Sequence, residues 1–453
     1  MGTFLQRERR EKFPLVNVTE PQYRRDLFPY SGVPKITFDG KDVPIDPPEE
    51  IFITCTTFRD GQQARPPYTV KQIVDLFDLI HRLGGPNGVI RQSEFFLYTE
   101  KDRESVEKCM ERGYRFPEIT SWIRASEKDF QLVKQMGIKE TGILTSCSDY
   151  HIFSKLGSDR KGTMEGYLDL VRKAIEAGVK PRCHLEDLTK ADIYGFVIPY
   201  VQELMAIAED SGVGVKVRMC DTLGYGISYP GSALPRSVPR LVHTLIHDGG
   251  VPKEQLEWHG HNDFHKGLIN ATTAWLYGCA ALNGTLLGLG ERTGNTPIEG
   301  LIFEYIGLMG GDENGINTNV VTEIAEYYEK ELGYKVPANY PFCGEDFNLT
   351  RAGIHADGVI KNEEIYNIFD TVKFLKRPIK VGITDKSGAA GMAYWLNAYL
   401  GLTGDKKIDK RDPGILKILE WVDAQYNAGR TTAISDEEIL AVMKERAPQF
   451  FKA

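Results

Sequence analysis

Two histidines, His259 and His261, stand two positions apart in the segment HGHNDF. On a β-strand both side chains point to the same face, where they can chelate one divalent ion. Asp60, in the segment TTFRDGQQ, can add a hard oxygen ligand. These donors are nitrogen and oxygen without thiolate, so Mn²⁺, Co²⁺, Mg²⁺ and Zn²⁺ all suit them. A hydrogen-bonded pair of buried histidines is the alternative for an H-x-H motif taken alone.

Other strand-like segments also end in polar residues. They end in Thr57–Gln63, His184–Asp187, Asp221–Gly224 and Gly288–Asn295. In a barrel of parallel strands, the carboxyl ends of all strands meet at one face, so these residues are expected to converge on the histidine pair. The glycines between 288 and 294 are not a dinucleotide fingerprint, because that motif opens a helix after the first strand of a βαβ unit.

The elements that position these residues follow a repeating pattern. Eight β-rich runs are predicted, at 51–57, 89–97, 118–123, 141–146, 182–186, 214–220, 256–261 and 279–285. Amphipathic helical stretches alternate with them, among them 69–84, 164–178 and 200–212. Eight strand–helix alternations predict an α/β fold with a TIM (β/α)8 barrel. A doubly wound sheet is the second choice.

The chain divides into three predicted regions. Residues 1–50 are polar and rich in proline, which predicts an extended N-terminal arm over the body of the protein. Residues 51–310 are expected to form the catalytic barrel. From 311 to 453 helical patterns dominate, which predicts a mostly helical C-terminal domain.

Composition excludes several classes of function. The 55 Lys and Arg residues against 63 Asp and Glu residues give a net charge of −8 without a basic block, so no nucleic-acid partner is expected. The sequence has neither a secretory h-region nor an apolar run of about 18 residues, so we expect a cytoplasmic protein without a membrane partner. Seven cysteines without C-x-x-C spacing are expected to be reduced thiols.

The motifs TTFRDGQQ, HLEDLTKAD, CDTLGYG, HGHNDF and LGLGERTGN resemble those of the metal-dependent DRE-TIM acyltransferases and lyases. This family includes isopropylmalate, homocitrate and Re-citrate synthases and HMG-CoA lyase. The segment AGIHADGVIKN resembles the second domain of the synthases, whereas a lyase would usually stop near the end of its barrel. The resemblance therefore favours the Claisen-condensing branch, which uses acetyl-CoA and a 2-oxo acid.

The resemblance implies a metal site and its neighbours. Asp60, His259 and His261 match the family's metal ligands, Asn295 matches an asparagine that joins them in some members, and Mn²⁺ is the ion expected first. Arg59 matches the arginine beside the reacting carbonyl oxygen, which suits a cation for a developing negative charge. An ion pair of Arg59 with Asp60 at the barrel mouth is the structural alternative.

The resemblance also implies substrate-binding and catalytic residues. Gln63 matches a residue lining the site, and Thr222 matches the hydroxyl that holds the carboxylate of the keto acid. Glu186 matches the strand-five carboxylate. His355 and Tyr366 match the pair that the second domain of one subunit lends to its neighbour, which implies a homodimer.

Some of these positions keep a second interpretation. Histidine has a pKa near working pH, so His355 is expected to be the base. It is predicted to lie in a loop between Gly353 and Gly358, where a solvated histidine is the alternative. Glu186 could orient His355, activate the water that cleaves the thioester, or be a structural hydrogen-bond acceptor. Asp149 and His151 could belong to a helix cap or to the substrate rim.

Departures from the usual motifs bear on the 2-oxo acid. Cys55 and Gln62 replace acidic residues of the first motif, and Gly142 stands where homocitrate synthases place a histidine. Strand two delivers Arg91, Gln92, Ser93 and Glu94, where a branched apolar keto acid would require an apolar pocket. The arm with CTTFRDGQQARPPY is most similar to the Re-citrate synthase branch, whose substrate is oxaloacetate. Homocitrate or isopropylmalate synthesis is the alternative, followed by an HMG-CoA-type lyase or a silent keto-acid sensor.

Overall fold

The computed structural model describes residues 11–124, 126–310 and 315–451. Contacts within the chain separate two units, residues 1–317 and residues 318–453, and each is described by itself. The predicted regional limits at residues 50 and 310 stay predictions. The first ten residues of the predicted arm and residues 311–314 lie outside the described part of the chain.

The first unit is a closed barrel of eight parallel strands in sequence order. They are β1 (Phe52–Cys55), β2 (Ile90–Phe95), β3 (Glu118–Ile123), β4 (Glu140–Ser146), β5 (Lys180–Glu186), β6 (Lys216–Asp221), β7 (Leu256–Gly260) and β8 (Ala281–Gly284). β8 closes the barrel by pairing with β1, with Cys55 opposite Gly284. The predicted TIM barrel is confirmed, and the doubly wound sheet is excluded.

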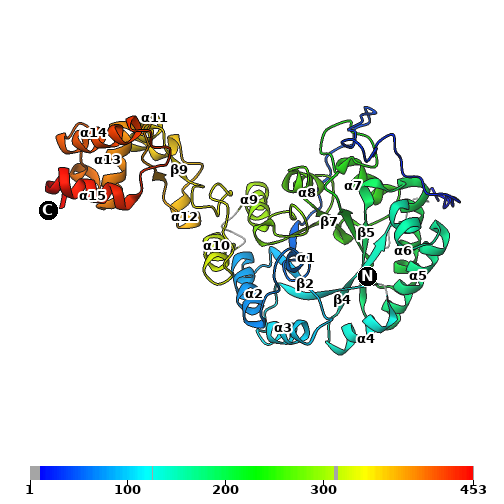
Figure 1. Cartoon of the computed structure of the whole chain (residues 1–453). Helices are drawn as coiled ribbons and strands as arrows, with labels where there is room; N and C mark the ends of the chain where they lie inside the picture. Colours follow the sequence, from blue (N-terminus) through cyan, green and yellow to red (C-terminus); the bar gives the residue numbers. More distant parts are fainter. Residues whose placement is uncertain (1–10, 125, 311–314, 452–453) are drawn as a thin grey trace. The chain divides into compact units, whose positions relative to one another are not determined.

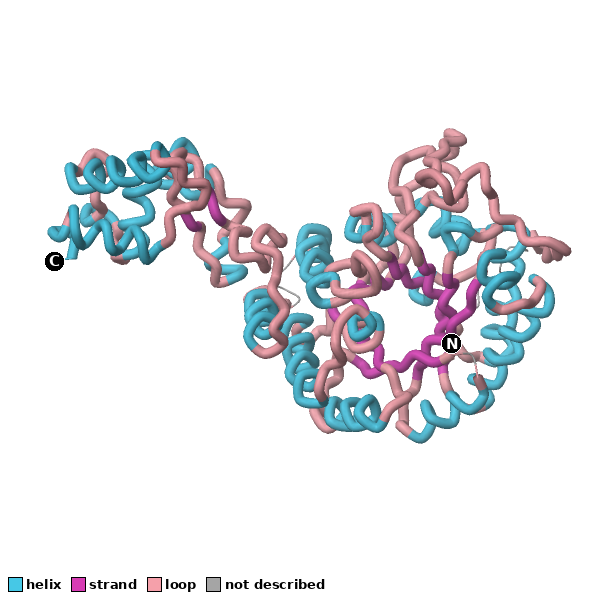
Figure 2. The backbone as a smooth tube through the Cα atoms, in the orientation of Figure 1, coloured by secondary structure: helices cyan, strands magenta, loops and turns pink. Residues whose placement is uncertain are grey.

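Helices surround the strands of this barrel, as Figures 1 and 2 show. They are α2 (Val70–Gly84), α3 (Glu100–Met110), α4 (Glu127–Gln135), α5 (Arg160–Glu176), α6 (Ile198–Ser211), α7 (Val238–His247), α8 (Gly267–Leu276) and α9 (Ile298–Met309). The sequence specifies where several of them begin. Thr69 forms a capping box with Gln72 at the start of α2, and Ser237 caps α7 by accepting a hydrogen bond from the backbone N–H of Arg240.

The interior of the barrel is polar and charged, unlike the aliphatic layers typical of this fold. Residues two positions apart on a strand point to the same side. The side chains that meet in the interior, from the amino-terminal to the carboxyl-terminal end, include Gln92, Glu140, Arg182, Glu94, Arg218, Glu257, His184 and His259. The hydrophobic positions that alternate with them, such as Val217 and Leu185, are buried as well.

Residues 11–50 form an extended segment along the outside of the barrel, shown in blue in Figure 1. The backbone N–H of Val16 donates to the carbonyl of Gly195, and the carbonyl of Lys35 accepts from the buried Arg236. Asp46 then pairs with Lys253, so the segment follows the barrel down to the start of β1. The extended conformation expected from the proline-rich sequence is present.

The second unit is mostly helical. Its helices are α10 (Val320–Lys330), α11 (Gly353–Lys361), α12 (Thr371–Leu375), α13 (Gly388–Tyr399), α14 (Pro413–Asn427) and α15 (Asp436–Arg446). Two short parallel strands, β9 (Leu349–Thr350) and β10 (Lys380–Val381), lie beside them. Leu396, Ile415 and Met443 belong to its own hydrophobic core. Among the described residues of either unit, no helix has the length and apolarity needed to cross a membrane.

Candidate metal centre and active site

Three predicted ligands meet at the carboxyl-terminal end of the barrel. Asp60 begins α1 (Asp60–Gln63) just after β1, His259 lies on β7, and His261 follows that strand. Asp60 Oδ2 lies 3.4 Å from His259 Nε2 and 3.7 Å from His261 Nε2. One possible ligand atom from each residue lies within 4.8 Å of the others, and all three side chains are buried. This arrangement is a possible site for a single metal ion.

The protonation states of this cluster suit a metal. Burial by itself would raise the pKa of Asp60, but Arg59 and the two histidines outweigh it and lower the pKa to about 2. Burial lowers the pKa of His259 to about 4 and also lowers the pKa of His261. At neutral pH the site therefore presents a carboxylate and two neutral imidazoles, which are the forms that bind metal ions.

Neighbouring side chains orient these ligands. Asn283 on β8 donates its amide to Thr54 Oγ1, so its carbonyl oxygen faces His259 Nδ1 at 2.8 Å. The proton of His259 is thereby placed on Nδ1, and Nε2 is left for a metal. Asn295 donates to Asp60 Oδ2, while its own Oδ1 is buried without a hydrogen-bond partner. An unpaired buried acceptor beside three ligands fits a bound cation.

Arg59 lies beside the possible metal site. Its guanidinium is 3.6 Å from Asp60 Oδ2 and stacks over the ring of Trp122 at 4.5 Å. The side chain is 13% exposed, and its Nε is buried without a hydrogen-bond partner. The ion pair with Asp60 considered as an alternative is present, but it leaves guanidinium donors available to an anion.

The polar residues of strand two do not form a substrate pocket. Gln92 and Glu94 belong to the buried interior network, in which Glu94 bonds Arg182, Arg218 and Thr56. Arg91 instead pairs with Glu50 at the edge of the barrel. The inference from a polar strand two to a polar keto-acid pocket is therefore wrong, since these charges mainly satisfy one another inside the barrel.

Glu186 is surrounded by donors at the end of β5. It bonds Ser146 Oγ, lies 3.0 Å from His151 Nδ1, and pairs with Lys155 at 2.9 Å. Burial would raise the pKa of Glu186, yet these partners, His151 first among them, lower it to about 2. Glu186 is consequently a carboxylate at working pH. The side chain of His151 contacts Glu186 and does not cap a helix.

The remaining predicted residues lie around this mouth or in the second unit. Thr222 Oγ1 accepts a hydrogen bond from the backbone N–H of Asp187, and its own hydroxyl hydrogen is still available. Gln63 is exposed at the end of α1. In the second unit, the rings of His355 and Tyr366 lie 4.2 Å apart, so the predicted pair is formed there, with His355 on helix α11 rather than in a loop.

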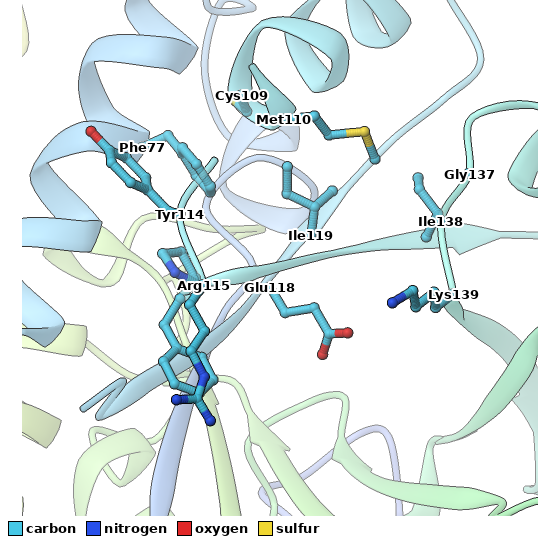
Figure 3. Close-up of a pocket in the computed structure, with 12 residues that line it drawn as sticks. Phe77, Cys109, Met110, Tyr114, Arg115, Glu118, Ile119, Gly137, Ile138 and Lys139 are labelled. Carbon is cyan, nitrogen blue, oxygen red and sulfur yellow. The ribbon is translucent and has the colours of Figure 1, made fainter. Parts of the chain in front are cut away.

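A separate pocket lies at the opposite end of the barrel, where β3 and β4 begin (Figure 3). It has a volume of about 490 Å³ and is lined by Phe77, Met110, Tyr114, Ile119 and Ile138 among others. Because several of its lining residues, such as Tyr114, Ile119 and Ile138, lead into or begin β3 and β4, the pocket is not part of the candidate site.

Sequence reasoning missed several residues that support the site. Asn283, Trp122 and the interior arginines Arg182 and Arg218 were not singled out. The signal for the arginines was available, because Arg182 stands two positions before His184 and four before Glu186 on one face of the same strand. Asn283 carries no such pattern, since its role depends on the neighbouring strand β7.

A closed (β/α)8 barrel with an Asp–His–His cluster at its carboxyl-terminal mouth defines a metal-dependent TIM-barrel enzyme. Residues 50–327 match the HMGL-like family, and the chain belongs to that family. The resemblance found in the motifs is thus confirmed.

Individual relatives are similar over nearly the whole chain. A protein of Syntrophus aciditrophicus named citrate (Re)-synthase is 61% identical over 97% of this chain and 70% of its own length. One of Clostridium kluyveri with the same name is 54% identical over 96% of both chains. A 2-phosphinomethylmalate synthase of Streptomyces hygroscopicus is 37% identical over 95% of this chain and 97% of its own length.

A solved structure supports the fold. The HMG-CoA lyase of Bacillus subtilis matches with a TM-score of 0.50 and 18% identity, covering 65% of this chain and 97% of the lyase. At this identity the likeness concerns the barrel fold alone.

Proposed function

We propose that this chain is a citrate (Re)-synthase, which condenses acetyl-CoA with oxaloacetate and hydrolyses the thioester to citrate and CoA. The observation that carries this proposal is the 54% identity to the Clostridium kluyveri citrate (Re)-synthase over 96% of both chains. The 61% identity to the Syntrophus aciditrophicus protein supports it. The expected acyltransferase chemistry and the choice of oxaloacetate are thereby supported together.

The residues at the barrel mouth suit this chemistry. Asp60, His259 and His261 would hold the divalent ion, with Asn295 beside them. A bound divalent ion supplies Lewis acidity to the ketone of a 2-oxo acid, and Mn²⁺ is the ion we propose. Arg59, whose Nε is buried without a hydrogen-bond partner, would stabilise the negative charge that develops on the ketone oxygen.

The carboxylate of the keto acid and the methyl group of acetyl-CoA require further partners. Thr222 has a hydroxyl hydrogen to donate to the carboxylate, and Gln63 is accessible at the rim. His355 is the proposed base for the methyl group, with Tyr366 against its ring. We propose that a homodimer brings this pair to the barrel of the partner subunit. The expected cytoplasmic location stays a prediction.

A substrate panel tests the proposed activity. Purified protein with Mn²⁺ and acetyl-CoA is given oxaloacetate, 2-oxoglutarate or 2-oxoisovalerate, and release of free CoA is followed. We expect the highest kcat/KM with oxaloacetate and citrate as the product. A higher kcat/KM for either competitor would show that the chain is a homocitrate or isopropylmalate synthase instead.

Stereochemistry distinguishes this activity from that of the common citrate synthase. Citrate made from labelled acetyl-CoA is degraded by a stereospecific citrate lyase, and the position of the label is read. We expect attack on the face of oxaloacetate opposite to that used by the common enzyme. Label in the other arm of citrate would contradict the Re assignment.

A further inference from the structure

His151 occupies an ordered position next to Glu186. It lies on a short π-helix, η1 (Tyr150–Lys155), which follows β4. His151 Nδ1 lies 3.0 Å from Glu186 Oε2, and its side chain is 20% exposed. Lys155 Nζ is farther from Nδ1, at 3.4 Å, and itself pairs with Glu186, so the carboxylate is the hydrogen-bond partner of Nδ1. Because an ionised carboxylate can only accept, we assign the proton to Nδ1, which leaves the lone pair of a neutral ring on Nε2.

The second ring nitrogen of His151, Nε2, makes no hydrogen bond to the neighbouring Asp187. His151 Nε2 lies 3.7 Å from Asp187 Oδ2, which is longer than a hydrogen bond. That oxygen already accepts from Ser148 at 2.6 Å and pairs with Lys190 at 3.0 Å. Asp187 therefore does not engage Nε2, which lies at the mouth of the barrel.

The N-terminal arm and α5 hold η1 in place. Asp149, directly before η1, accepts two hydrogen bonds from the fully buried Arg160, at 2.8 and 2.9 Å. It also accepts from the backbone N–H of Gln22, and the hydroxyl of Tyr150 donates to the carbonyl of Tyr23, both at 2.7 Å. The position of His151 is thus fixed from both sides, and π-helices often mark functional sites.

The proposed reaction requires a base that Glu186 alone does not provide. After the carbon–carbon bond has formed, the citryl thioester must be hydrolysed by water. Glu186 is bonded to Ser146, His151 and Lys155, and a carboxylate held so strongly in its ionised form is a weak base. A histidine oriented by a carboxylate is the usual arrangement for activating a hydroxyl group or water.

We propose that His151, oriented by Glu186, is the general base that activates water for hydrolysis of the citryl thioester. This role rests on the proposed function. His151 Nε2 takes a proton from water as the water oxygen bonds to the thioester carbonyl carbon, whose oxygen takes up the electron pair. The oxyanion then re-forms the carbonyl as the carbon–sulfur bond breaks. The CoA thiolate leaves and receives the proton from His151, which gives citrate and CoA.

The variant His151→Gln separates hydrolysis from condensation. In a single turnover with acetyl-CoA and oxaloacetate, quenched in acid, citryl-CoA and citrate are measured by mass spectrometry. Removal of a general base slows its step by about 100-fold or more, so citryl-CoA should accumulate while condensation continues. His247→Gln, the same substitution at an exposed position of α7, is the matched control and should behave as wild type.

A second assay measures hydrolysis by itself, so its result does not depend on which 2-oxo acid the enzyme condenses. Synthetic citryl-CoA is offered directly, and His151→Gln should hydrolyse it about 100-fold more slowly than wild type. Tyr150→Phe, which removes the hydrogen bond to the arm, should show a smaller defect in the same step. Equal hydrolysis by wild type and His151→Gln, or equal loss of condensation and hydrolysis, would overturn the proposal. Failure of wild type to make citrate from oxaloacetate would instead refute the proposed function.

Discussion

At the scale of single residues, the candidate metal centre depends on side chains that do not themselves bind the ion. Asn283 fixes the proton of His259 on Nδ1 and so leaves Nε2 free. We predict that Asn283→Ala lowers the affinity for Mn²⁺ by about 10- to 100-fold, the usual cost of losing such a supporting partner. Metal-binding isotherms on chelator-treated protein give the affinity. An unchanged affinity would show that Asn283 is a packing residue.

His261→Ala should have the more severe effect. Removing one of three protein ligands leaves an incomplete coordination shell, so we expect bound metal and turnover to be lost together. Metal content after dialysis and condensation kinetics measure the two quantities. His243→Ala, on the outside of the barrel on α7, is the control that should retain both. Turnover in fully metal-free wild type would contradict the assignment of the site.

A glycine supports the same centre by having no side chain. A Cβ at Gly290 would lie 1.6 Å from Asn295 Oδ1. Gly290→Ala should therefore displace Asn295, break its bond to Asp60, and weaken Mn²⁺ binding by about 10-fold or more. Gly307→Ala is the matched control, because a Cβ there meets open space. Equal Mn²⁺ affinity in both variants would show that Asn295 does not support the site.

At this scale the sequence predicted the site by type and spacing. The alternation of side chains on a strand is enough to place His259 and His261 together. The approach of Asp60 from β1 requires closure of the barrel between β8 and β1, which the repeating pattern made predictable. The bond from His151 to Glu186 depends on the conformation of a π-helix after β4, and no periodicity in the sequence specifies that conformation.

At the scale of elements, the strands were predictable because β-rich runs alternate with amphipathic helical stretches along the sequence. The interior of the barrel was not, because the sequence does not show which charged side chains pair across strands. Glu94 on β2 contacts Arg182 on β5 and Arg218 on β6, which are distant in sequence. The sequence therefore indicates only that strand two is polar, whereas the structure shows that Glu94 pairs with these arginines inside the barrel.

This interior network predicts a pH dependence of stability. Burial would raise the pKa of Glu94, but Arg218 and Arg182 lower it from 4.5 to about 2. Since the pKa in the folded protein lies below the unfolded value, the stabilisation is complete above about pH 4.5 and is lost as the pH falls toward 2. The free energy of unfolding in urea should decrease over this range.

Glu94→Gln tests this contribution. At pH 7 this substitution removes the carboxylate that pairs with the buried Arg182 and Arg218. We expect the free energy of unfolding to fall by about 3–5 kcal/mol. Its stability should also fall less between pH 4.5 and 2 than that of wild type. Glu111→Gln removes an exposed partner of Lys108 and should leave the free energy of unfolding close to that of wild type, because water screens such a pair. Parallel pH profiles for wild type and Glu94→Gln would contradict the role of the network.

At the scale of the whole molecule, the two units have separate cores, and the proposed chemistry needs residues from both. The proposed base His355 and its neighbour Tyr366 lie on the second unit, whereas Arg59 and the metal ligands lie on the first. Tyr366 is 41% exposed beside His355, so this pair can meet another surface. A base must come within hydrogen-bonding distance of the methyl group that it deprotonates.

Mixed dimers decide which subunit receives the base. We predict that Arg59→Ala and His355→Ala, each inactive alone, regain activity when co-expressed. If His355 serves the partner's barrel, each mixed dimer contains one intact site, and random assembly gives up to about a quarter of the wild-type activity. Co-expression of Arg59→Ala with Asp60→Ala is the control, since both changes damage the barrel and no intact site can form. Purified mixed dimers without activity would show that His355 acts in its own subunit, whereas full activity of His355→Ala by itself would show that His355 takes no part in catalysis.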